Sequence, residues 1–159
     1  MRALFSFFTA LPVGENSTLE EAAQSSHLLP FVGLVTGLPA SGLLFAGLFP
    51  PGVAAALALS AVLLAAGLHH TDGVLDAGDA LMVRGTPSRR REVLKDARIG
   101  VGGLGALFIV YVPTLFALAS LAGFSAYLAA VSLLAAEVAA QRIVEQVGLY
   151  QADVLRSTR

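Results

Sequence analysis

The chain has 159 residues, of which 56% are hydrophobic and only 13% are charged. Soluble domains carry about 25% charged residues, so a water-soluble fold of this size would expose much apolar surface, and the composition indicates a membrane protein. The net charge of -1 provides no basic field for nucleic acid, and the absence of cysteine excludes disulfides, thiolate metal sites and thiol catalysis.

The N-terminal segment, residues 1–13, combines one Arg with a short run that contains Phe5, Phe7 and Phe8. A cleaved signal peptide would need a small-x-small site before the mature start, and the segment has none. We therefore expect an interfacial or re-entrant segment, with its Phe rings at headgroup depth.

Four apolar stretches reach or approach the roughly 20 residues that a helix needs to cross a bilayer. They are residues 28–49, 52–68, 103–121 and 126–147. The Pro50-Pro51-Gly52 and Gly123-Phe124-Ser125 segments predict a tight hairpin within each pair. The second stretch is short, and we expect it to continue helically through residue 69. The sequence thus predicts one all-α domain over residues 1–159, a polytopic membrane bundle of about four spans.

The basic residues set the orientation, because positively charged loops stay in the cytoplasm. Neither hairpin carries Lys or Arg, and the C-terminal tail carries Arg156 and Arg159. The segment between the second and third spans carries six basic residues: Arg84, Arg89, Arg90, Arg91, Lys95 and Arg98. We therefore expect a multi-pass protein of the cell (inner or plasma) membrane, with both termini and the central segment in the cytoplasm.

The central segment also predicts a short cytoplasmic amphipathic helix over residues 88–97. Thr86 is a good N-cap, and Pro87 suits the first helical position. The glycines that begin at Gly100 end this helix.

The first and fourth spans carry features of helix packing. Gly33, Gly37 and Ser41 form a small-xxx-small series, which predicts close contact with another helix and can also pair two copies of the chain. Glu137 and Arg142 are too poorly spaced to pair on one helix, so we favour roles in which they face a cavity. Glu145 lies nearer the interface and should be solvated. The series leaves a homo-oligomer as an expectation.

Asp72, Asp76 and Asp79 recur at i, i+4 and i+7, which places them on one stripe of a helix. Three like charges repel, so a cation should neutralise them. Mg²⁺ takes oxygen ligands, typically one or two carboxylates together with substrate phosphates. Asp96 can complete the set from the adjacent helix, which gives Asp72, Asp76, Asp79 and Asp96 as metal ligands.

Basic side chains follow the acidic stripe and suit phosphate oxygens, Arg in particular through two parallel hydrogen bonds. The candidates are Arg90, Arg91, Lys95 and Arg98, with Arg89 beside them. Carboxylates for a metal beside arginines for phosphate are typical of phosphoryl transfer. His70 can act as a ligand or a base. In the alternative interpretation the loop is simply solvated, and its exposed Asp–Arg pairs are worth only ~0–1 kcal/mol each.

Four segments resemble the cobalamin synthase family, adenosylcobinamide-GDP ribazoletransferase. The most specific are His70-Thr71-Asp72-Gly73-Val74-Leu75-Asp76-Ala77-Gly78-Asp79, which is similar to the family's His-x-Asp-Gly-x-x-Asp-x-x-Asp signature, and Lys95-Asp96-Ala97-Arg98-Ile99-Gly100, which is similar to its Lys-Asp-Ser-Arg-hydrophobic-Gly signature. The segments 7–13 and 29–37 resemble its Thr-x-hydrophobic-Pro-Val start and the entry to its first span.

The resemblance implies a Mg²⁺-dependent membrane enzyme with two substrates, adenosylcobinamide-GDP and α-ribazole or its 5′-phosphate. It would join them, release GMP and form adenosylcobalamin or its phosphate, the last assembly stage of cobalamin (vitamin B12) biosynthesis. By position, Asp72, Asp76, Asp79 and Asp96 would be the metal and catalytic acids. Lys95 and Arg98 would contact phosphate. Our hypothesis is that Asp96 accepts the proton of the ribazole hydroxyl.

The chain departs from the family pattern mildly at Ala10, at Val74-Leu75 and at Ala97. The larger departure is length, because the family generally runs well past 200 residues with further spans. We expect either a short variant or a truncated one.

Two other functions fit parts of the pattern. A CDP-alcohol phosphotransferase also uses spaced aspartates on membrane helices, but its signature needs an Asp where His69 stands, together with an Ala-Arg pair that is absent. A non-enzymatic membrane subunit or transporter would carry its charges deep in the bundle, and only Glu137 and Arg142 fit that description.

Overall fold

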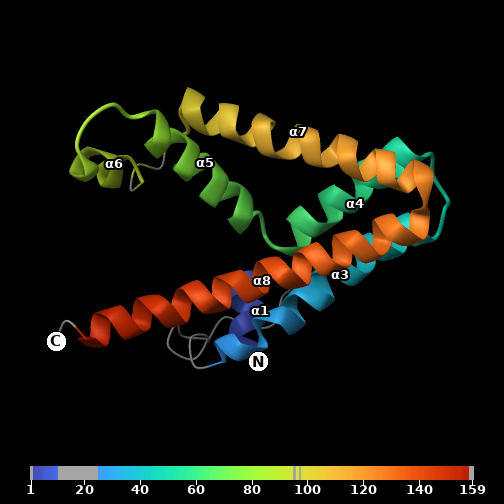
Figure 1. The fold of residues 1–159 in the computed structure, drawn as a ribbon, viewed down its shortest axis with the longest axis horizontal. Coiled ribbons are helices and arrows are strands. Elements are labelled where there is room, and N and C mark those ends of the chain that lie inside the picture. Colours follow the sequence, from blue (N-terminus) through green and yellow to red (C-terminus); the bar gives the residue numbers. More distant parts are fainter. Residues whose placement is uncertain (1, 11–24, 95, 97, 158–159) are drawn as a thin grey trace.

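The regular elements of this computed structural model, which describes residues 2–10, 25–94, 96 and 98–157, are all helical. Three are short: α1 (Arg2–Phe8), the 3₁₀ turn η1 (Ser26–Leu28) and α6 (Pro87–Val93). Five are longer: α3 (Leu29–Phe45), α4 (Pro51–Ala65), α5 (His69–Met82), α7 (Val101–Phe124) and α8 (Ala126–Ser157) (Figure 1).

Three helical stretches of the described chain are long and apolar enough to cross a membrane. They are Ser26–Phe45, Val101–Phe124 and Ala126–Ile143. A fourth span is obtained only if α4 and α5 are counted together, and these two helices bend by 89° at their junction. The prediction of an all-α protein with multiple membrane helices is confirmed, with three to four candidate spans.

The junction between α4 and α5 corrects the expected continuous helix. The Leu68 N–H donates to the Leu63 carbonyl at 2.9 Å, and the Gly67 N–H donates to the Leu64 carbonyl at 3.0 Å. This pair of hydrogen bonds defines a Schellman motif, a helix C-cap in which a glycine just past the last turn takes a left-handed conformation. Gly67 has φ +64°, and Leu68 follows with φ +61°. The expectation that the second stretch continues helically through residue 69 was therefore wrong.

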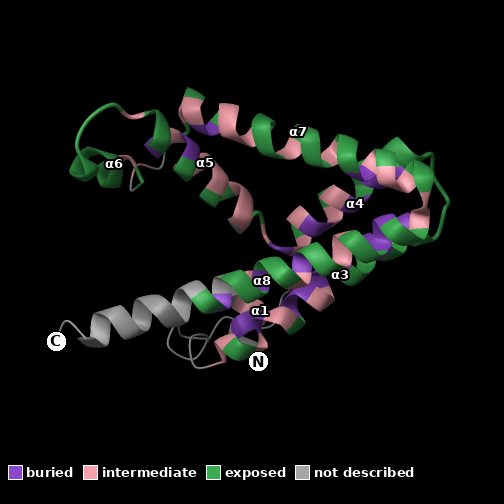
Figure 2. Cartoon of the chain, viewed as in Figure 1, coloured by how far each residue is buried: buried purple, intermediate pink, exposed green. Residues whose placement is uncertain are grey.

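The long helices form two antiparallel hairpins whose turns lie at the same end of the molecule (Figure 1). Helix α3 packs along α8, while α4 and α5 both pack on α7. Near the turns the core is built of small side chains, including Ala54, Ala55 and Ala58 of α4. The outer side of α7 is exposed and apolar (Figure 2), with Phe108 and Ile109 uncovered, as expected of a surface that faces lipid.

The small-residue series of α3 makes the predicted close helix contact, and its partner is α8 of the same chain. A Cβ on Gly33 would lie 2.9 Å from the Glu137 carbonyl oxygen, and one on Gly37 would lie 3.0 Å from Leu134 Cδ1. Ser41 is also buried. Because α8 of the same chain already covers this face, the structure gives no support to a homo-oligomer through Gly33, Gly37 and Ser41.

The polar residues of α8 differ from expectation. Glu137 is buried and accepts the Thr36 hydroxyl at 2.9 Å, so it faces α3 rather than a cavity. Arg142 is exposed, and its Nη1 lies 3.7 Å from Glu145 Oε2. Glu145 itself is only 8% exposed, so the expectation that it is solvated was wrong. The side of α8 that carries it packs inward.

The structure also describes the short helices α1 and α6, each in a segment that the sequence analysis singled out. Leu4 of α1 is buried against Leu29 and Val32, and Phe5 meets Phe31 edge-on at 6.4 Å. Residues 11–13 of the expected N-terminal segment lie outside the described part. Helix α6 begins as predicted, since the Thr86 hydroxyl accepts the Arg89 N–H at 3.5 Å, but it ends at Val93 rather than at residue 97.

Candidate active site

Helix α5 carries the acidic stripe across the open side of the molecule, between α7 and α8 (Figure 1). Its first turn is held from both sides. The Thr71 hydroxyl lies 3.1 Å from the Tyr111 hydroxyl of α7, and the His70 Nε2 lies 3.3 Å from the Gln141 Nε2 of α8. Asp72 follows these two anchors directly. The start of the stripe is therefore fixed against both arms of the α7–α8 hairpin.

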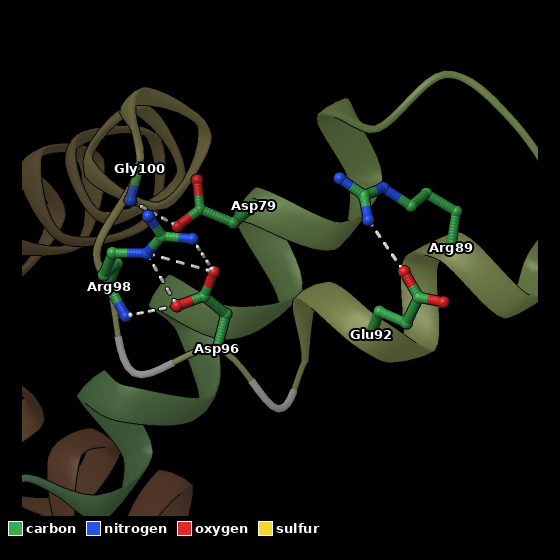
Figure 3. A network of polar contacts seen from close by, with 6 residues as sticks. All are labelled: Asp79, Arg89, Glu92, Asp96, Arg98 and Gly100. Atoms are coloured by element: carbon green, nitrogen blue, oxygen red, sulfur yellow. Dashed lines mark hydrogen bonds and ion pairs between the residues drawn. The ribbon is translucent and has the colours of Figure 1, made fainter.

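Asp79, at the far end of the stripe, caps the N-terminus of α7 from outside that helix. Its Oδ2 accepts the Gly100 N–H at 2.7 Å, and its Oδ1 accepts the Gly103 N–H at 2.8 Å (Figure 3 shows the Gly100 bond). The first N–H groups of a helix have no partner within it and attract negative charge. Hydrogen bonds to a charged group contribute about 1.5–3 kcal/mol each, so Asp79 holds α5 to α7.

Two glycines, one on each helix, allow this close approach of α5 and α7. A Cβ on Gly78 would lie 2.5 Å from Ala106 Cβ and 2.7 Å from the Gly102 carbonyl oxygen. A Cβ on Gly103 would lie 2.7 Å from the Leu75 carbonyl oxygen. Any larger side chain would push the helices apart and move Asp79 away from the amides that it accepts.

Asp96 lies on the segment between α6 and α7 and is paired with Arg98. The Arg98 Nη2 donates to Oδ2 at 2.7 Å, its Nε donates to Oδ1 at 3.0 Å, and its backbone N–H donates to Oδ1 at 3.1 Å (Figure 3). The Arg98 guanidinium, and after it the Arg98 backbone N–H, lower the pKa of Asp96 from 3.8 to about 2. Asp96 is therefore a carboxylate at neutral pH.

All four predicted aspartates line one pocket of about 230 Å³. Asp72, Asp76 and Asp79 contribute from α5, and Asp96 contributes from the segment before α7, with Arg98 at the same wall. A neighbouring pocket of about 470 Å³ shares Asp79, Asp96 and Arg98. The sequence prediction that Asp96 joins the stripe thus agrees with the arrangement of the pocket.

The four carboxylates line this pocket but do not converge on a single point. Within residues 2–10, 25–94, 96 and 98–157, no three His, Asp or Glu side chains are close enough to hold a metal ion together. Carboxylate oxygens are nevertheless the donors that Mg²⁺ takes, and this ion keeps several waters and uses substrate phosphates. An open acidic pocket beside an arginine fits that donor set.

The predicted phosphate contacts are divided by the structure. Arg98 lines the pocket, and its side chain is 89% exposed. Arg90 donates from Nε to the Val83 carbonyl at 3.3 Å, and Arg91 is exposed on α6. Arg89 pairs with Glu92 at 2.7 Å, away from the acids (Figure 3). Lys95 lies outside the described residues. Of the described candidates, Arg98 alone lines the acidic pocket.

His70 is turned toward α8 and does not line the acidic pocket. Its partner Gln141 is fully buried, and sequence reasoning did not single it out. A signal was available, because Gln141 lies one helical turn after Glu137 within an apolar span. Polar residues within spans usually face the bundle interior.

The chain is similar to known proteins over most of its length. Residues 1–157 match the family described as cobalamin-5-phosphate synthase. An adenosylcobinamide-GDP ribazoletransferase of Saccharolobus islandicus is 43% identical over 129 residues, which cover 79% of this chain and 50% of that protein.

Two further relatives carry the same name. The protein from Thermoplasma acidophilum is 40% identical, over 86% of this chain and 51% of its own length. The one from Halorubrum lacusprofundi is 41% identical, over 69% of this chain and 43% of its own. The chain thus spans about half the length of the curated relatives it matches. No solved structure matches it. On the family match and these identities, the chain belongs to the cobalamin-5-phosphate synthase family.

Proposed function

We propose that this chain carries the acidic site of an adenosylcobinamide-GDP ribazoletransferase. The observation that carries the proposal is one pocket lined by Asp72, Asp76, Asp79 and Asp96, with Arg98 at its wall. Family membership favours this function over a CDP-alcohol phosphotransferase and over a non-enzymatic membrane subunit.

The reaction is a transfer of a phosphorus-bearing group. A ribose hydroxyl oxygen of α-ribazole, or of its 5′-phosphate, forms a bond to the phosphorus that is attached to cobinamide. The bond from that phosphorus to the bridging oxygen of the pyrophosphate breaks, and GMP leaves with the electron pair. The hydroxyl proton passes to a base. Positioning and neutralisation of charge carry most of the catalysis in such transfers.

Asp72, Asp76 and Asp96 are the proposed holders of Mg²⁺. Asp79 would also bind the metal, through the oxygen lone pairs that its two hydrogen bonds to backbone amides do not use. When bound, the metal would neutralise negative charge on the pyrophosphate and on the leaving GMP. The surrounding carboxylates would repel the substrate pyrophosphate in the absence of the ion, so substrate binding should require metal.

Arg98 links phosphate binding to the base. While it pairs with Asp96, the pKa of that carboxyl stays near 2, which makes Asp96 a weak proton acceptor. The guanidinium is 89% exposed and can turn toward a substrate phosphate. In the metal-free pocket its departure would raise the pKa of Asp96 toward 3.8 and make it a better proton acceptor. We therefore keep Asp96 as the proposed base, and Asp76 as the second catalytic acid.

The remaining predicted residues take supporting roles in the proposal. Arg90, Arg91 and Lys95 would attract the anionic substrate toward the pocket mouth. His70, whose Nε2 faces Gln141, would support the start of α5. The site would face the cytoplasm of a cell membrane, because the segment that joins α5 to α7 carries most of the basic residues.

A turnover assay tests the proposal. Membranes containing the chain would be given adenosylcobinamide-GDP, α-ribazole and Mg²⁺, and both GMP and the cobalamin product would be measured. We expect product that disappears with EDTA and in Asp76→Asn. The matched control is Glu92→Gln, an acidic residue exposed on α6, which should keep wild-type turnover. Folded wild-type chain that forms no product, or Asp76→Asn that stays active, would contradict the proposed function.

A further inference from the structure

Polar side chains inside α8 form a buried row that the proposed reaction does not use. Glu137, Gln141 and Glu145 follow one another at one-turn spacing, and their exposed fractions are 8%, 0% and 8%. Burying such groups between apolar helices is costly unless they bond to a partner. The middle member of the row reaches out of the α3–α8 pair to the acid-bearing helix.

Gln141 is locked in position by α3. A Cβ on Gly33 would lie 3.0 Å from Gln141 Cγ and 2.9 Å from the Glu137 carbonyl oxygen, so this pair of helices meets at bare backbone. The neighbouring Glu137 is engaged elsewhere, since its Oε1 accepts the Thr36 hydroxyl at 2.9 Å. The Gln141 side chain therefore packs against α3 at its Cγ, and its amide nitrogen faces His70.

The chemistry of the contact fixes the tautomer of His70. In the amide orientation that the structure shows, the Gln141 Nε2 lies 3.3 Å from the His70 Nε2 and can only donate, while the buried Gln141 Oε1 has no hydrogen-bond partner among the described residues. The His70 Nε2 must then accept, so a neutral ring carries its proton on Nδ1. The hydrogen bond made by one ring nitrogen generally decides which nitrogen is protonated.

The next residue fixes α5 from the opposite side. The Thr71 and Tyr111 hydroxyls are 3.1 Å apart, which ties the same helical turn to α7. Consecutive residues are thus bonded to α8 and α7, and Asp72 follows at once. Rotation of this turn would swing Asp72, and one turn later Asp76, around the helix axis.

We propose that Gln141 is a positioning residue that holds His70 as the Nδ1–H tautomer and thereby sets the rotation of the acidic stripe. Its effect on turnover rests on the proposed function, but the tautomer does not. In this role His70 does not offer its Nε2 as a base. Gln141 affects the reaction only through the positions of Asp72 and Asp76, which it does not contact.

Nitrogen NMR of ¹⁵N-histidine-labelled chain in lipid nanodiscs tests the tautomer. The sequence has 3 histidines, and the His70 signals are assigned as those lost in His70→Asn. In the wild type we expect a protonated Nδ1 and an unprotonated, hydrogen-bonded Nε2. In Gln141→Met, a substitution that keeps the volume, His70 should exchange between tautomers. Gln146→Met, the same change on the exposed side of α8, should leave the wild-type signals.

Turnover tests the positioning. Partners that orient metal-binding groups typically contribute roughly 10- to 100-fold in affinity or activity, and we expect a loss of that size in kcat for Gln141→Met, with the KM for α-ribazole little changed. Gln146→Met should match the wild type.

Each outcome decides a separate claim. Wild-type His70 protonated on Nε2, or a tautomer unchanged in Gln141→Met, would overturn the role of Gln141, and the wild-type spectrum decides even if the variant does not fold. Full kcat in a folded Gln141→Met would overturn the positioning. The expected tautomer in a chain without turnover would instead contradict the proposed function and leave the role of Gln141 toward His70 standing.

Discussion

At the scale of single residues, Asp79 and Asp96 have the same side chain and meet different surroundings. Asp79 accepts two backbone N–H groups of α7, whereas Asp96 is paired with an exposed arginine. The stripe at i, i+4 and i+7 predicted that the α5 acids lie on one side. It did not predict the capping role of Asp79, because that contact joins residues more than twenty positions apart and depends on how closely two helices pack.

Removing the Asp79 carboxylate should loosen the start of α7. We predict that Asp79→Ala lowers the free energy of unfolding by about 1–3 kcal/mol, since two amides lose a charged acceptor. Hydrogen exchange at the Gly100 and Gly103 amides should become faster. Asp72→Ala, at an exposed position on the same helix, is the control and should leave both rates unchanged. Unaltered exchange in Asp79→Ala would refute the cap.

The pairing of Asp96 with Arg98 sets a pH dependence. The pKa of Asp96 is lowered from 3.8 to about 2, so the pair is complete above pH 3.8 and is lost as the pH falls through about 2. In Arg98→Gln the pKa of Asp96 should return toward 3.8. Carbon NMR of the Asp96 carboxyl, in metal-free buffer, measures both values. Arg89 is the weakest of the influences that lower this pKa, so Arg89→Gln should raise it much less than Arg98→Gln does. An unshifted pKa in Arg98→Gln would count against the pair.

At the scale of elements, the sequence predicted most helices and missed one break. Apolar length and the Pro- and Gly-bearing turns located α3, α4, α7 and α8, and Thr86-Pro87 located the start of α6. The end of α4 was missed because Gly67 lies within an apolar run, and an isolated glycine in such a run does not by itself predict a stop. Gln141 was missed because its importance depends on His70, which lies on another helix.

The contact between α5 and α7 should tolerate no side chain at Gly78. We predict that Gly78→Ala lowers the free energy of unfolding by about 1–3 kcal/mol, because its Cβ would meet Ala106 Cβ at 2.5 Å and the Gly102 carbonyl oxygen at 2.7 Å. Thermal unfolding in detergent measures the loss. Gly105→Ala is the matched control, since it has nothing within 4 Å and should be neutral or stabilising. Equal melting temperatures for the two variants would disprove the close packing.

At the scale of the whole molecule, composition predicted a membrane protein and the fold is consistent with that. The two hairpin turns lie at one end, and the basic α6 segment lies at the opposite end (Figure 1). Composition could not predict that α4 and α5 would part at 89° and leave the acids on an open side. The membrane orientation remains a prediction, because it rests on the distribution of Lys and Arg.

The absence of cysteine makes the orientation directly testable. We predict that Ser88→Cys, on the basic α6, reacts with a membrane-impermeant maleimide only from the cytoplasmic side. Gly47→Cys, in the turn after α3, should react only from the opposite side. Labelling of sealed right-side-out and inside-out vesicles compares the two. Both cysteines reacting from one side would contradict the topology.

The central claim is that the pocket lined by the four aspartates binds the metal, and manganese binding tests it most directly. Mn²⁺ would be titrated into the wild-type chain in nanodiscs and followed by electron paramagnetic resonance. We predict a bound ion in the wild type and in Glu92→Gln, displaced by Mg²⁺, and loss of that binding in the double variant Asp72→Asn/Asp76→Asn. Binding that is equally tight in the folded double variant would place the metal elsewhere and contradict this account.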